Sequence, residues 1–137
     1  MKKLLTLILF VSISAMTFTQ SYAQSNGKAA KLPEGDWVLV GPDINNQGDV
    51  YYDRDSVLID EDTIMFTDLL VKPSGELRTM DYVIYPKKRQ YGYSTVTRYD
   101  QNGKGVIQHF DYILTMSIYK KNGGMDKILQ VILKNEK

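Results

Sequence analysis

The chain has 137 residues, of which 17 are Lys or Arg, 16 are Asp or Glu and one is His, so its formal net charge is +1 at pH 7. A charge so close to zero produces no global field that would draw the protein to nucleic acid or to acidic lipid. The length indicates one domain with one core, and the absence of cysteine argues against disulfides and against a lipid anchor carried on cysteine.

The N-terminus has the pattern of a secretory signal peptide. Lys2 and Lys3 precede an apolar run over residues 4–18, and small residues stand at Ser21 and Ala23, the −3 and −1 positions of a cleavage site. A run of roughly 15 residues is short for a membrane span, which needs about 20. Cleavage after Ala23 removes 23 of 137 residues and leaves 114, with a net charge near −1 because two lysines are lost. We therefore expect an exported protein, periplasmic, secreted or at the outer surface, that is not a lipoprotein and has no integral membrane segment after signal cleavage.

The mature chain divides into a leader and one domain. Residues 24–35 are small and polar and end near Pro33, which predicts a flexible leader. The ordered domain is expected to cover residues 36–137.

Short apolar or alternating runs separated by turn residues predict an antiparallel meander. The runs expected to form strands are 37–40, 50–52, 63–71, 77–85, 91–99 and 106–107, and residues 57–59 are a brief apolar stretch between two turns. Asn102-Gly103 before the last run is a strong hairpin signal, because both residues tolerate positive φ.

Alternation also predicts which side chains share a face of the sheet. Within 77–85, Met80, Tyr82 and Ile84 fall on one face. Within 91–99, strict alternation puts five side chains on one face: Tyr91, Tyr93, Thr95, Thr97 and Tyr99.

The C-terminus changes to helical periodicity. Five apolar residues form one stripe: Met125, Ile128, Leu129, Ile132 and Leu133. Residues 112–119 fit a strand or a helix equally well. The predicted fold class is α+β, an antiparallel meander of about five to six strands packed by a C-terminal amphipathic helix.

The residues give little support for catalysis. His109 is the one histidine, and Asp111 could orient it from the same strand face. No Gly-x-Ser-x-Gly nucleophile elbow accompanies this pair. A surface histidine beside a carboxylate is the favoured interpretation, and we do not expect an enzyme.

Metal and cofactor sites are not expected either. Residues 43–48 match the start of an EF-hand loop, but Arg54 stands where a bidentate glutamate belongs. Residues 100–105 place Lys104 at a ligand position, and residues 60–62 hold three carboxylates without a ligand spacing. Solvated turns explain all three segments, and no Gly-rich phosphate loop precedes a helix.

One basic and aromatic group of residues is a candidate binding surface. It consists of Lys87, Lys88, Arg89, Tyr91, Tyr93 and Tyr99. Tyrosine is common at interfaces, so the group could contact a protein or a polyanion. The alternative is a turn with solvated charges beside tyrosines that face the core.

Three segments resemble the surface-adhesin protein E family: residues 36–40 (DWVLV), 50–57 (VYYDRDSV) and 99–104 (YDQNGK). The resemblance spans about residues 36–133 and implies an antiparallel sheet with a C-terminal helix. The best-known member is a lipid-anchored, dimeric outer-membrane protein that binds laminin, vitronectin and plasminogen. This chain lacks the lipidated cysteine and the cysteine pair that many relatives carry.

These observations predict a non-enzymatic, exported cell-envelope binding protein that resembles surface-adhesin E and binds host matrix or serum proteins. The alternative is a periplasmic accessory protein, an inhibitor or assembly partner, that binds another bacterial envelope protein. An open sheet edge would also permit a homodimer.

Overall fold

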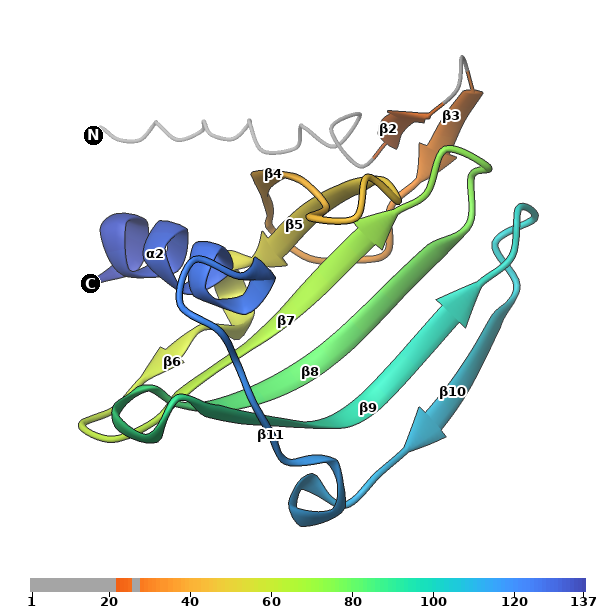
Figure 1. Ribbon diagram of the computed structural model, residues 1–137. Helices are drawn as coiled ribbons and strands as arrows, with labels where there is room; N and C mark the ends of the chain where they lie inside the picture. The colour runs from red at the N-terminus through yellow and green to blue at the C-terminus, as the bar shows by residue number, and fades with distance from the viewer. Residues whose placement is uncertain (1–21, 26–27) are drawn as a thin grey trace, which may run out of the picture.

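The computed structural model describes residues 22–25 and 28–137 (Figure 1). Most of the predicted signal peptide, residues 1–21, lies outside the described residues. No helix in the described part of the chain is long and apolar enough to cross a membrane.

An eight-stranded antiparallel sheet forms the body of the protein, in the order β10-β9-β8-β7-β5-β4, with β11 paired to β9 and β6 paired to β7. Its strands are β4 (Trp37–Pro42), β5 (Asp49–Asp53), β6 (Leu58–Ile59), β7 (Ile64–Val71), β8 (Leu77–Tyr85), β9 (Gln90–Tyr99), β10 (Gly105–His109) and β11 (Ser117–Ile118). Three 3-10 turns, η3 (Arg54–Ser56), η4 (Pro86–Lys88) and η5 (Tyr112–Thr115), interrupt the meander, and α2 (Gly124–Glu136) ends the chain. The predicted α+β fold class is confirmed.

Helix α2 packs on one face of the sheet, at the β4–β5 side (Figure 1). The predicted stripe makes this contact, and Ile132 is completely buried together with Tyr52 and Ile84 of the sheet. Each end of the helix is tied down. Asp126 accepts a hydrogen bond from the backbone N–H of Asn122 at 2.7 Å, and Glu136 near the other end accepts one from the Tyr52 hydroxyl.

A smaller core lies on the opposite face of the sheet. Leu69, Val71 and Leu77 are buried there together with Leu32, which is 6% exposed. Leu32 belongs to the segment predicted as a leader, in which β2 (Tyr22–Ser25) and β3 (Lys28–Lys31) also pair. The packed domain thus begins at Leu32, ahead of the expected start at residue 36, because this leucine covers an apolar patch that the helix does not reach.

Strand β9 contains a bulge that the alternation pattern did not reveal. Asp81 pairs with Thr95, whereas its neighbour Tyr82 pairs with Tyr93, so Ser94 is an extra residue in β9. A bulge reverses the facing of all residues on one side of it. The prediction that the five alternating residues of 91–99 share one face is therefore wrong: Tyr91 and Tyr93 face the helix-side core, and Tyr99 packs with the opposite core.

The ambiguous segment 112–119 contains both a turn and a short strand, η5 and β11. Asp111 caps η5 by accepting a hydrogen bond from the N–H of Ile113 at 2.9 Å. The turn crosses directly over Gly92, where an added Cβ would lie 2.8 Å from the carbonyl oxygen of Tyr112. Thr115 then bonds both to the N–H and to the C=O of Tyr93, at 2.8 Å each. The segment leaves β10, passes over β9 and rejoins its edge.

Candidate ligand-binding cleft

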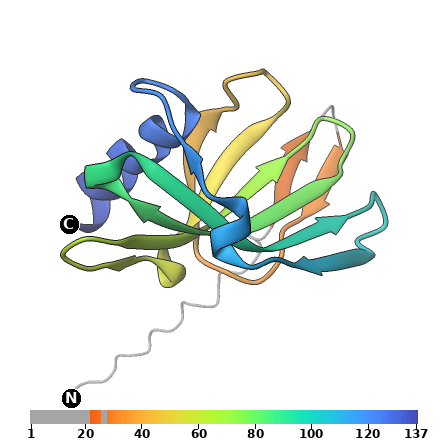
Figure 2. The same cartoon turned by 60° about the horizontal axis from the view of Figure 1, so that its bottom comes forward.

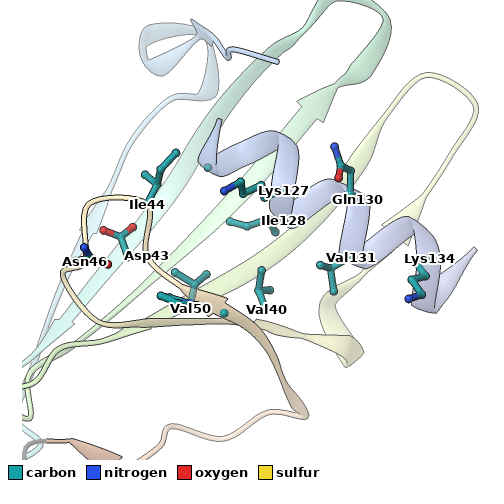
Figure 3. A pocket seen from close by; sticks show the side chains of 13 residues that line it. Val40, Asp43, Ile44, Asn46, Val50, Lys127, Ile128, Gln130, Val131 and Lys134 are labelled. Carbon is teal, nitrogen blue, oxygen red and sulfur yellow. The ribbon is translucent and has the colours of Figure 1, made fainter. Parts of the chain in front are cut away.

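A cleft of about 640 Å³ separates α2 from the β4–β5 hairpin (Figure 3). This volume lies within the range of small-ligand sites, about 300–1,000 Å³. Its lining comes from β4 and the loop after it, from the start of β5 and from one side of α2. The lining residues are Val40, Gly41, Pro42, Asp43, Ile44, Asn46, Val50, Gly124, Lys127, Ile128, Gln130, Val131 and Lys134.

The floor of the cleft is formed by Val40 and Val50, which both pack toward the helix-side core. A bulge in β4 lies at this point, since Leu39 pairs with Tyr51 but the next pair is Gly41 with Val50, which leaves Val40 as the extra residue. Gly41 has φ of +146°, a conformation that side chains rarely permit, so glycine allows the irregular strand to continue into the loop. The result is an apolar surface under the helix.

The loop between β4 and β5 is held by its own polar groups. The N–H of Asp43 donates to the carbonyl of Gly48 at 2.7 Å, and the Asp43 carboxylate accepts from the N–H of Asn45 at 3.1 Å. Ile44 at the tip remains 54% exposed and lies beside the first turn of α2, where a Cβ added at Gly124 would be 3.6 Å from it. Ile44 and Gly124 together line one end of the cleft.

The helix supplies an apolar wall with a cation toward each end. Ile128 and Val131 face the floor in Figure 3, and Lys127 and Lys134 stand along the same stretch of helix. These lysines are seven positions apart, a separation of roughly 10 Å along a helix axis. Neither lysine belongs to an ion pair among the residues that the structure describes. The cleft therefore offers apolar contact flanked by two unneutralised positive charges.

The side chains that line this cleft offer apolar contact and positive charge. Its polar side chains are the lysines, one amide on each side and Asp43, whose carboxylate is engaged by the loop. A nucleophile in contact with a general base, the arrangement that covalent catalysis needs, is not among its lining residues. An apolar group with an acidic substituent is the ligand that fits this combination.

The basic turn predicted as a binding surface has structural partners. Lys87 forms an exposed ion pair with Asp62 at 3.0 Å. The guanidinium of Arg89 lies 5.5 Å from the ring centre of Tyr119, a cation–π contact, and Arg89 has positive φ at the end of η4. Lys88 is exposed. These charges do not join the cleft, which lies on the helix and the β4–β5 hairpin.

The three tyrosines of the predicted surface are separated. Tyr91 packs between Tyr82 and Tyr119, with ring centres 5.9 and 6.4 Å away. Tyr93 lies edge-on to Phe110 at 5.4 Å on the same side of the sheet, whereas Tyr99 belongs to the opposite core. The structure therefore does not bring the three rings and the basic turn together on one face.

His109 and Asp111 also have separate roles. His109 is exposed, with Nδ1 3.5 Å from the Thr95 hydroxyl, and the carboxylate of Asp111 caps η5. Within the described residues, no group of three or more potential ligands could hold a metal ion. The Asp100 carboxylate accepts from the N–H groups of Asn102 and Lys104 at 2.9 Å each, as expected for a hairpin turn.

Sequence reasoning missed the cleft residues. Lys127 and Lys134 lie outside the apolar stripe predicted for the helix, and their spacing beside Val131 was the available signal. The opposite wall had no signal, because the β4–β5 loop approaches α2 only when these distant elements pack together.

Comparison of the chain with models of protein families, with curated proteins and with solved structures gives no match. The cleft is therefore interpreted from its own geometry and chemistry.

Proposed function

We propose that this protein is a non-enzymatic binding protein of the bacterial cell envelope. In this proposal it is exported with cleavage of its signal peptide and holds an apolar, acidic segment of a partner protein in the cleft between α2 and the β4–β5 hairpin. The observation that carries the proposal is the open cleft with an apolar floor and two lysines that form no ion pair with any described residue. Its resemblance to surface-adhesin E supports a host matrix or serum protein as the partner.

The site is tested by charge reversal in the cleft. We expect the double variant K127E/K134E to bind its partner at least about tenfold more weakly, a loss of about 1.4 kcal/mol, because acidic groups would then be repelled. The control is K120E/K121E, which changes two exposed lysines outside the cleft lining. Binding to immobilised laminin, vitronectin and plasminogen is measured at low and high salt, since screening should reduce the difference between the variants.

The location of the protein decides which partner to assay. Protease digestion of the protein in intact cells would place it at the surface and support host proteins as partners. Protection until the outer membrane is permeabilised would refute the adhesin proposal and direct the binding assay to envelope proteins.

Equal affinity of K127E/K134E and the unmodified protein would reject the cleft as the site.

A second candidate function is that of an accessory protein that meets another envelope protein, or a second copy of itself, through a sheet edge. Along β10, η5 and β11 several large apolar side chains are exposed: Val106, Ile107, Phe110, Ile113, Leu114 and Ile118. A contiguous apolar edge strand is a typical site of strand pairing. We expect I107K to abolish a stoichiometric complex or dimer in size-exclusion chromatography with light scattering. A monomer that gains no partner on mixing with envelope extract would contradict this candidate.

A further inference from the structure

The turns that end β7 and β9 lie at the end of the sheet away from α2 (Figure 2). A second hollow, of about 380 Å³, is lined by residues in and beside these turns. It is lined by Gln47, Leu70, Lys72, Glu76, Leu77, Arg78, Arg98, Tyr99, Asp100, Lys104 and Val106. Four of these side chains are cationic and two are acidic. The excess of positive charge distinguishes this hollow from the rest of a nearly neutral protein.

Two arginines of the hollow stand directly opposite each other in the sheet. Arg78 of β8 pairs with Arg98 of β9, so their side chains project from the same face. Leu70 pairs with Arg78 on one side and Val106 with Arg98 on the other, so neither neighbour in this row neutralises the charge. Like charges directly opposite on adjacent strands are destabilising. An anion in the hollow that both arginines line would reduce this repulsion.

Among the described residues, the two arginines have few hydrogen-bond and ion-pair partners. Arg98 is exposed and donates through Nη1 to the amide oxygen of Gln108 at 2.8 Å, a neutral partner. Nη2 of Arg78 lies 3.5 Å from Oδ2 of the buried Asp68, a long distance for an ion pair. Its Nε, and Oδ1 of Asp68, are buried and have no hydrogen-bond partner among the described residues.

The acidic groups nearby are weak competitors for an anion. Asp100 is held in the β9–β10 turn by two backbone N–H groups. Glu76 is exposed, at the end of the β7–β8 turn. Burial raises the pKa of Asp68 to about 7, so near neutral pH a large fraction of this carboxyl group carries no charge to offset Arg78.

We infer that this hollow is an anion site that takes a phosphate or sulfate ester group between the guanidinium groups of Arg78 and Arg98. The planar fork of each guanidinium suits the oxygens of such an ester, and Lys72 and Lys104 add point charges at the rim. The hollow has room for one sugar-sized group bearing the ester. The inference does not rest on the proposed function, because the α2 cleft shares no lining residue with this hollow.

The test is a titration of the isotope-labelled protein, followed by amide NMR shifts, with inorganic phosphate, glucose 6-phosphate, glucose 6-sulfate and glucose. We expect the esters to shift the amides around residues 76–78 and 98–106, and glucose to leave them unchanged. R98Q should weaken ester binding at least about tenfold, as loss of a charge-assisted pair predicts. R98K should weaken it less, since it keeps the charge and loses the fork.

Two controls separate this site from other cationic surfaces. K88Q removes an exposed charge from the η4 turn, and K120E/K121E reverses two exposed charges outside both hollows, so both should bind the esters as the unmodified protein does. Thermal unfolding of each variant verifies the fold. Unchanged ester affinity in R98Q, shifts confined to the η4 turn or the α2 cleft, or equal binding of glucose would each overturn the inference.

Discussion

Asp68 is an ionisable residue at the centre of the sheet. It faces the helix-side core from β7, and only 2% of it is exposed. Burial is the largest cause that raises its pKa to about 7, and the Arg78 guanidinium only partly opposes the rise. In the unfolded chain an aspartate has a pKa near 3.9. Between about pH 4 and pH 7 the folded state therefore binds more protons than the unfolded state.

This difference predicts a pH-dependent stability. We expect the contribution of Asp68 to the free energy of unfolding to fall as pH rises from about 4 to about 7, and D68N to lack this fall. Urea unfolding at about pH 5, 6 and 8 measures it, with E34Q at an exposed position as the control. The same pH slope in D68N and the unmodified protein would contradict the assignment.

Gly48 and Gly41 allow a matched comparison at the β4–β5 loop. Their φ angles are +149° and +146°, so an added side chain strains the backbone similarly at both. At Gly48, however, a Cβ would lie 2.0 Å from the carbonyl oxygen of Val71, whereas at Gly41 it would meet no atom within 4 Å. We expect G48A to lower the free energy of unfolding by at least about 3 kcal/mol and G41A by about 1 kcal/mol. Equal unfolding midpoints in urea would show that the loop relaxes to accept the methyl group.

At the scale of the elements, the facing of the side chains in β9 depends on one extra residue, Ser94. Its bulge at Ser94 lets Tyr91 and Tyr93 face the helix-side core while Tyr99 packs on the opposite face. Deletion of Ser94 would restore strict alternation and force one of these sets out of its core. We therefore expect the deletion to abolish cooperative unfolding, and S94A, which keeps the residue count, to shift the midpoint only slightly. Circular dichroism during urea titration distinguishes the two, and a cooperative deletion variant would show that the bulge is dispensable.

For the molecule as a whole, the N-terminal pattern predicts processing. We expect the exported protein to begin at Gln24, because Ser21 and Ala23 occupy the small-residue positions before the cleavage site. Mass spectrometry of the protein recovered from envelope and cytoplasmic fractions measures this terminus. A change of Ala23 to a bulky residue (A23F) should leave the precursor unprocessed, whereas A29F, beyond the site, should not. An intact Met1 in the envelope fraction would contradict cleavage.

Local pattern determined much of this fold. The residues of β8 and the stripe of α2 were predicted because alternation and helical period depend only on neighbouring residues. The hairpin at Asn102-Gly103 was predicted for the same reason, since its turn lies within residues 100–104, where Gly103 has a φ of +82°. Export remains a prediction from the sequence, because the signal-peptide pattern depends only on the order of basic, apolar and small residues along residues 1–23.

The tertiary structure alone decided the binding surfaces. The bulge at Ser94 leaves no local signature, yet it reverses the facing of β9 and so determines which of its side chains meet. The cleft exists because the β4–β5 loop and α2, far apart in the chain, lie side by side, and the arginine pair exists because β8 and β9 take one register. Sites assembled from distant segments depend on packing between elements, and that packing is not encoded in the pattern of any one of them.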